Sequence, residues 1–199
     1  MSSQEIIKRL RLGEVSYSIE ASEAVRHLSH WKGARMEIII DHALPEDAIE
    51  RVTILNYSEN RPGSVFHVPA HWHKHHSEYI SIHEGRCMIT LDGKTRIVHA
   101  DDPDPTVYIP AWHTHSMQGF EGEKLVLQER ADPAGLYKAE FFNDMMSQGS
   151  MPGFWHAMRA FYDGDTWVAL PGNIGIVDQA FTLVFGTIAK LIESPKATL

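Results

Sequence analysis

Short strand patterns separated by turn signals fill residues 34–131 and restrict the folds open to this chain. Asp92-Gly93 is a strong two-residue hairpin signal, and it joins strands expected over 86–91 and 94–99. Two prolines within 101–105 demand a loop, because proline cannot donate to a central sheet ladder. Further strands are expected over 36–40, 50–57, 65–68, 78–82, 107–109, 113–118 and 123–129. This spacing favours an antiparallel all-β sandwich or barrel over alternating βαβ units.

Composition and charge restrict the kind of protein and the kinds of binding partner that are expected. The 199 residues suit one domain with an extension, and a hydrophobic content of 43% supports a real core. Acidic residues outnumber basic ones by 26 to 18, giving a formal charge of -8, which argues against nucleic acid as a partner. The single cysteine, Cys87, cannot form an internal disulfide and is expected in the core. The polar start of the chain carries no apolar signal core, so a soluble cytoplasmic protein is expected.

Two segments flank the strand region. Residues 1–33 form a leader in which Glu5 to Leu12 is predicted to make a short helix, packed on the barrel or on a second subunit. After Asp132-Pro133 the apolar spacing becomes helical, and residues 132–199 are interpreted as a C-terminal helical extension.

The longest predicted helix covers residues 174–192, with Asn173 as its expected N-cap. Its apolar stripe is predicted to pack against the barrel or a partner subunit, with a membrane surface as the alternative. A full membrane span is disfavoured, because the apolar run is shorter than the ~20 residues that a bilayer requires. The stripe consists of Ile174, Val177, Phe181, Val184, Ile188 and Leu191, and the opposite side carries Asp178, Thr182, Gly186 and Lys190.

The run from His71 to Glu78 holds four histidines and one carboxylate, an unusual density of metal-binding groups. On a strand, residues two apart face the same side, so His71 and His73 point together. The polar residues that follow can turn the chain and return Glu78 on a neighbouring strand. A barrel could bring His115 across to the same point. Three imidazoles and one carboxylate would leave about two open positions on a six-coordinate ion.

The pattern His71-x-His73-x4-Glu78-x6-Gly85 is similar to the first motif of the cupin family. Its glycine suits a turn where a residue without Cβ is useful. The resemblance implies a jelly-roll β-barrel over residues 34–131. With the helical extension, the chain looks like the small single-domain metal-binding cupins of the fungal natural-product type.

The pattern Pro110-x-Trp112-x-x-His115 resembles the second cupin motif, Pro-x-Gly-x-x-His, with a tryptophan in the place of the glycine. By this resemblance one divalent metal ion is bound, which could be iron, manganese, nickel or zinc. The implied ligands are His71, His73, Glu78 and His115.

Other histidines lie beside this set. His75 and His76 are interpreted as exposed loop residues, or one of them as a contact to a ligand or to substrate. His113 shares strand parity with His115 and could face the pocket. Proton transfer is assigned to His113 or His75. Candidates for an apolar pocket wall are Trp72, Trp112, Tyr108, Phe66, Met88 and Met117.

The leading functional hypothesis is a metal-dependent cupin enzyme that acts on a small apolar organic substrate by Lewis-acid chemistry. Isomerisation, cyclisation (including pericyclic ring closure), decarboxylation and lyase chemistry all fit, in natural-product biosynthesis. The alternatives are an iron(II)-dependent dioxygenase and a non-catalytic cupin that binds a small ligand. A homodimer is expected, because cupin barrels commonly pair.

Overall fold

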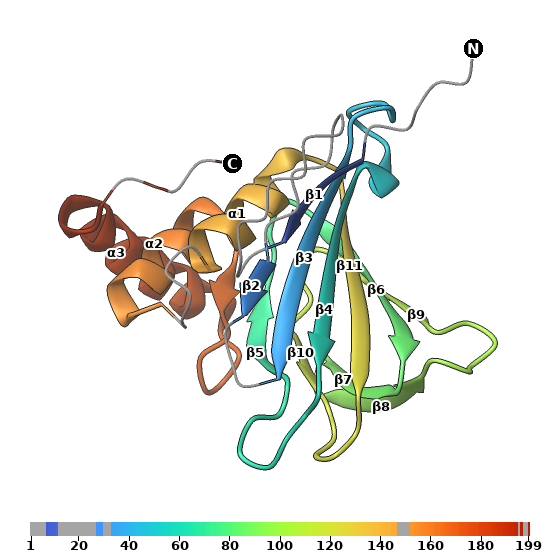
Figure 1. Ribbon diagram of the computed structural model, residues 1–199. Coiled ribbons are helices and arrows are strands. Elements are labelled where there is room, and N and C mark those ends of the chain that lie inside the picture. The colour runs from blue at the N-terminus through green and yellow to red at the C-terminus, as the bar shows by residue number, and fades with distance from the viewer. Residues whose placement is uncertain (1–6, 12–26, 30–32, 147–151, 195, 197–198) are drawn as a thin grey trace.

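The computed structural model describes residues 7–11, 27–29, 33–146, 152–194, 196 and 199, and its core is two facing antiparallel sheets (Figure 1). The first sheet contains β1 (Ile7–Arg11), β2 (His27–Ser29), β3 (Ala34–Asp41), β4 (Val52–Ser58), β11 (Leu125–Asp132), β6 (Ser77–Glu84) and β9 (Thr106–Ile109). The second contains β12 (Trp167–Val168), β5 (His67–Trp72), β10 (His115–Gln118), β7 (Arg86–Leu91) and β8 (Lys94–His99). The prediction of an all-β barrel is therefore confirmed.

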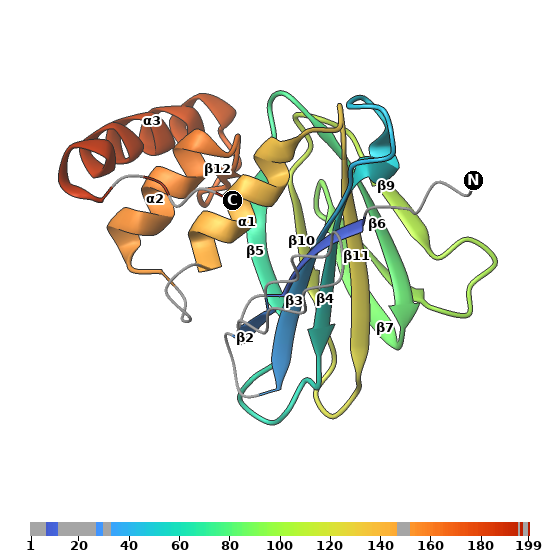
Figure 2. The same ribbon diagram turned by 45° about the horizontal axis from the view of Figure 1, so that its top comes forward.

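Three helices follow the strands: α1 (Leu136–Met146), α2 (Phe154–Asp163) and α3 (Gly175–Ile192). Both views place α1 next to the barrel, α2 beyond it and α3 outermost (Figures 1 and 2). Between α2 and α3, strand β12 pairs with β5, so that Trp167 lies opposite Trp72. The helical extension is thus joined to the edge of the second sheet.

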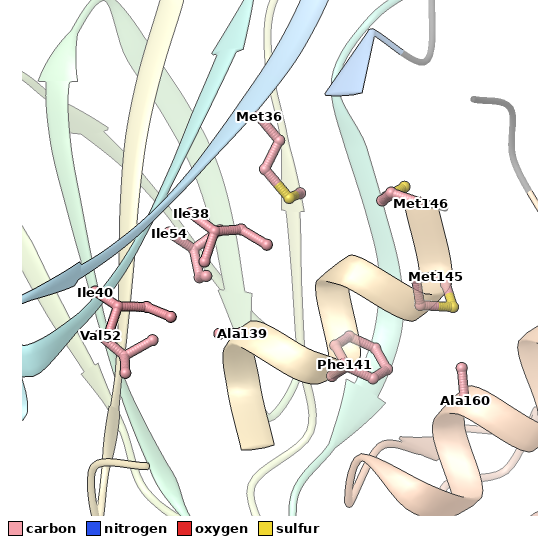
Figure 3. Close-up of a cluster of buried hydrophobic side chains, with 10 residues drawn as sticks. All are labelled: Met36, Ile38, Ile40, Val52, Ile54, Ala139, Phe141, Met145, Met146 and Ala160. Atoms are coloured by element: carbon pink, nitrogen blue, oxygen red, sulfur yellow. The ribbon is translucent and has the colours of Figure 1, made fainter. Parts of the chain in front are cut away.

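Alternating inward side chains build the core, as the period of a strand requires. One apolar cluster fills the space between the sheets, with Ile80, Leu127 and Val98 fully buried. Cys87 lies there too, and burial raises the pKa of its thiol to about 12, which confirms it as a core residue. A second cluster forms where α1 covers β3 and β4 (Figure 3); its members are Met36, Ile38, Ile40, Val52, Ile54, Ala139, Phe141, Met145, Met146 and Ala160.

The predicted helix from Glu5 to Leu12 is wrong over its described part, because residues 7–11 form β1, which pairs with β3 from Ile7 opposite Asp41 onward. An isolated helix of this length is unstable in water, whereas the edge of β3 offers unpaired backbone groups. Residues 1–6 and 12–26 of the leader lie outside the described residues.

Helix α3 also departs from its prediction. Asn173 adopts a positive φ of 49° and does not cap the helix; the N-cap position is Ile174, which makes no side-chain cap bond. The buried face is the polar and small one, namely Asp178, Thr182, Gly186 and Ala189. The apolar stripe faces outward instead, so its expected packing against the chain's own barrel is wrong. A Cβ on Gly186 would lie 2.5 Å from Tyr162 of α2, and this close approach selects the small face.

Gly85 forms the tight connection between β6 and β7. Its φ is +74°, a region that favours glycine, and a Cβ placed there would lie 1.9 Å from the carbonyl oxygen of Lys124. Gly93 has nearly the same φ, +75°, but open space around it. Substitutions at the two positions therefore distinguish the cost of backbone strain from the cost of a steric collision.

We predict that Gly93→Ala lowers the free energy of unfolding by about 1 kcal/mol, the cost of a left-handed alanine. Gly85→Ala adds a collision with main chain and should cost about 3 kcal/mol or more. Urea denaturation of both variants measures the difference. Equal losses would show that the Lys124 carbonyl moves aside freely.

Candidate metal centre

The four predicted ligands converge between the two sheets. His71 and His115 are direct neighbours across β5 and β10, His73 follows the end of β5, and Glu78 lies on β6. One carboxylate oxygen of Glu78 is 3.0 Å from His73 Nε2, and the other is 3.0 Å from His115 Nε2. One ligand atom of each of the four residues lies within 4.8 Å of the others.

Each ligand imidazole is fixed through its Nδ1 atom by a main-chain carbonyl. A carbonyl oxygen only accepts, so Nδ1 carries the proton and donates it, and this hydrogen-bond pattern leaves Nε2 with a lone pair. The acceptors for His71, His73 and His115 are the carbonyl oxygens of Pro69 at 2.8 Å, Asp165 at 2.8 Å and His113 at 3.2 Å.

The converging lone pairs fit a metal ion. His73 Nε2, His115 Nε2 and Glu78 Oε2 are buried and have no hydrogen-bond partner among the described residues. Burial lowers the pKa of His73 to about 4 and also depresses the pKa of His71, so both imidazoles are neutral near pH 7. Neutral nitrogens facing a carboxylate at 3.0 Å repel one another unless a cation lies among them. The donor set of three nitrogens and one oxygen suits a divalent transition metal.

Lys138 of α1 enters the same cluster, which the sequence interpretation did not foresee. Its buried ammonium donates to Glu78 and to Glu129, the latter at 2.8 Å. Burial opposes its charge, but Glu129 and Glu78 outweigh burial and raise the pKa of Lys138. Burial also raises the pKa of Glu129 to about 7, although Lys138 works against the rise. Lys138 shares the helical stripe of Phe141, which was the signal available in the sequence.

His76 and Asp165 form a second layer around the ligands. His76 is buried, its ring lies 4.1 Å from that of His73, and its Nδ1 is 2.9 Å from Asp165 Oδ2. The Asp165 carboxylate also accepts the backbone N–H groups of Lys74 and His75. Burial would raise the pKa of Asp165, but these bonds hold it well below its usual range. The interpretation of His76 as an exposed loop residue is wrong, because its side chain is buried against His73, one of the predicted ligands. The alternative, a contact to a ligand or to substrate, stays a prediction.

The two histidines proposed for proton transfer lie outside the donor cluster. The His75 side chain is exposed, and only its backbone N–H reaches Asp165, at 2.7 Å. The His113 side chain is 45% exposed and pairs with Asp92, while its carbonyl oxygen holds His115. Among the described residues, His76 is the additional histidine beside Glu78, at 3.7 Å. A role in proton transfer for His75 or His113 stays a prediction.

Trp112 occupies the position at which the second cupin motif has a glycine. Its φ is +69°, a conformation that a glycine adopts most easily. Its N–H donates to the carbonyl of His73 at 2.6 Å, and its ring stacks on Trp72 at 5.2 Å. Trp167 stacks on Trp72 as well, at 5.4 Å. Of the other predicted wall residues, Phe66 and Met117 lie in the apolar core and Tyr108 is exposed.

The depressed pKa of His73 predicts acid sensitivity of the metal-free protein. The unfolded imidazole titrates near 6.5 and the folded one at about 4, so between these values only the unfolded chain binds the proton. Stability is therefore present above pH 6.5 and is lost as pH falls, by about 2 kcal/mol between pH 7 and pH 5. Urea unfolding with a chelator present should show His73→Asn losing this dependence and His75→Asn keeping it. An unchanged slope in His73→Asn would refute the assignment.

We also predict that Asp165 sets the affinity of the metal centre. Asp165→Asn keeps the main-chain carbonyl that holds His73 but places an amide N–H₂ group against the backbone N–H groups of Lys74 and His75. This displaces the segment that carries His73 and should weaken metal binding about 10–100-fold, as disturbance of the groups around a ligand does. Asp163→Asn is the matched control, because Asp163 pairs with Lys190 at 2.8 Å instead. Competition with a chromophoric chelator measures both affinities. Equal affinities in the two variants would exclude an orienting role.

Comparison with known proteins shows which family part of this chain resembles. Residues 59–127 match the family model described as a cupin domain. No curated protein sequence matches the chain. Similar solved structures include KdgF from Halomonas sp. (18% identity, 54% of this chain and 84% of that chain, TM-score 0.41). A predicted oxalate decarboxylase from Thermotoga maritima is 17% identical over 53% of this chain and 89% of that chain, with a TM-score of 0.39. CapF from Staphylococcus aureus is 17% identical over 53% of this chain and 29% of that chain, with a TM-score of 0.43.

These TM-scores are below 0.5, so the similarities carry no argument about function. The matched segment itself contains all four donors and spans β5 to β10. Residues 59–127 of this chain are thus similar to a cupin domain, and the two facing antiparallel sheets agree with a cupin fold.

Proposed function

We propose that this protein is a metal-dependent cupin enzyme acting on a small apolar organic substrate by non-oxidative chemistry. The observation that carries the proposal is the convergence of His71, His73 and His115 on the buried carboxylate of Glu78, with one ligand atom of each within 4.8 Å of the others. A bound iron, manganese, nickel or zinc ion would supply Lewis-acid polarisation of a carbonyl or enolate oxygen. His71, His73, Glu78 and His115 are the residues that would hold it.

The remaining residues of the site suit the stabilisation of negative charge. The ammonium of Lys138 is held beside Glu78, and Glu129 keeps it in place. A buried ammonium aimed at the cluster can donate to an oxyanion that develops on the substrate. His71 retains partial exposure, whereas His73, Glu78 and His115 are buried, so the substrate approaches from the side of His71.

Isomerisation and decarboxylation through an enolate develop negative charge on an oxygen, and polarisation of a carbonyl promotes cyclisation, including pericyclic ring closure. None of these reactions needs an external oxidant. We extend the proposal to a cytoplasmic enzyme of natural-product biosynthesis, in keeping with the fungal type of cupin that the sequence resembles. A Fe(II)-dependent dioxygenase is the second candidate, because the same four donors leave open coordination positions. A cupin that binds a small ligand without turnover is the third.

Metal removal tests the centre. Protein purified without an affinity tag should contain about one divalent ion per chain, and a chelator should remove it. Glu78→Ala and His115→Ala should retain less than a tenth of this content. His83→Ala is the control, because His83 is exposed and contacts Gln128 at 3.2 Å. Elemental analysis measures all four proteins, and full metal content in Glu78→Ala would reject the ligand set.

The reaction class is tested on the cobalt-loaded and native proteins. Apolar β-diketones, which carry an enolisable carbonyl, should shift the visible spectrum of the cobalt form if substrate oxygen reaches the centre. Turnover of a substrate identified in this way should stop with the chelator and continue without O₂. Turnover that requires O₂ would favour the dioxygenase, and binding without any product would favour the ligand-binding protein.

A further inference from the structure

The outer face of α3 is an uncovered apolar surface. Its exposed aliphatic side chains include Ile176 at 76%, Val184 at 55% and Leu191 at 82%. No described residue packs over them, although α3 itself is described throughout. We define the α3 face as Ile176, Val177, Ala180, Leu183, Val184, Thr187, Ile188 and Leu191. A contiguous apolar surface of this kind marks an interaction site in a soluble protein.

Helix α3 cannot rotate to bury this face in its own chain. On the opposite side, Asp178 is buried and accepts hydrogen bonds from Trp72 Nε1 at 3.2 Å and from the backbone N–H of Leu170 at 2.9 Å. Gly186 lies against Tyr162 at a distance that leaves no room for a Cβ. Turning the helix would expose these contacts and force larger side chains against α2. Among the residues that the structure describes, none can therefore cover the α3 face.

We propose that the α3 face is the contact between two copies of this chain, related by a twofold axis near Val184. Val177, Ala180, Val184, Thr187 and Leu191 recur at alternating intervals of three and four residues, the spacing of a helix–helix contact. An antiparallel pair centred on Val184 sets Val177 against Leu191 of the second copy. It likewise sets Ala180 against Ile188, a small residue against a large one.

The area and the charge of the α3 face agree with a second copy of the chain as its partner. An 18-residue helix is about 27 Å long, and half of its surface is on the order of 500 Å². Two copies would bury about 1,000 Å², the size from which a specific interface is expected. The α3 face carries no charged side chain, so pairing brings no like charges together. Phe154, 52% exposed and in contact with Phe185, adds apolar area at its rim.

A lipid bilayer is the alternative partner of the α3 face, because the length and composition of α3 would allow it to cross a membrane. Its buried Asp178 and its packing against α2 oppose a span. Binding flat on a membrane surface draws on basic residues around the apolar face. Helix α3 offers Lys190 alone, which pairs with Asp163, on a chain with a formal charge of -8. These features favour a second copy.

Sedimentation of the full chain between about 1 and 100 μM should show a monomer–dimer equilibrium. Val184→Lys places two ammonium groups at the axis and should weaken the dimer at least about 100-fold, since like charges in a contact cost several kcal/mol. Ile97→Lys is the matched control, an exposed aliphatic residue on β8, and should leave the dimer intact. Metal content verifies that both variants are folded.

A cysteine at the axis tests the geometry directly. Val184→Cys should form an intermolecular disulfide on oxidation and Ile97→Cys should not, while the native Cys87 is buried and does not compete. A dimer that persists in Val184→Lys, or a chain that stays monomeric at 100 μM, would overturn the proposal. Co-sedimentation of the monomer with phosphatidylcholine–phosphatidylglycerol vesicles, lost in Val184→Lys, would assign the α3 face to a membrane.

Discussion

The structure depends on a buried cluster in which imidazole lone pairs point at a carboxylate. Nε2 of His73 and Nε2 of His115 each lie 3.0 Å from one oxygen of Glu78. In both rings the Nδ1–H group donates its hydrogen bond to a main-chain carbonyl. With Glu78 ionised and the rings neutral, no proton lies between each Nε2 and its carboxylate oxygen, so these approaches are repulsive. A cation has to balance the cluster. Lys138 brings one positive charge from α1, and a divalent ion at the four donors would supply the rest.

The helical extension is part of this cluster and not an appendage to the barrel. Lys138 lies 60 positions after Glu78. Asp165, whose carbonyl orients His73, lies 92 positions after His73. Both lie outside the segment 59–127 that matches the cupin family. That segment holds the four donors and the carbonyls that orient His71 and His115, but it lacks Asp165, which orients His73, and Lys138, whose ammonium pairs with Glu78. We therefore expect barrel and extension together to determine the affinity of this cluster for a metal ion, because hydrogen-bond partners of ligands generally contribute to it.

Local features of the sequence predicted the local structure well. The hairpin at Asp92-Gly93 and the strands around it are as expected, since turn chemistry and strand period act over a few residues. The four candidate ligands were implied by the resemblance to the two cupin motifs, and the structure brings them together. Lys138 was visible as a charge on an apolar helical stripe, but its partner Glu78 is set by tertiary packing. Helical periodicity likewise showed that α3 has two different faces without showing which one turns inward, because Asp178 and Gly186 decide that through long-range contacts.

Trp72 connects the α3 face to the metal centre. It lies between the ligands His71 and His73, and its indole N–H donates to Asp178 of α3. Trp112 and Trp167 stack on it, so the indole has little freedom to follow a displaced acceptor. A second copy bound to the α3 face would hold the helix in place and Asp178 against Trp72. Metal binding and self-association then stabilise the same buried hydrogen bond, and by linkage each would strengthen the other by the same factor.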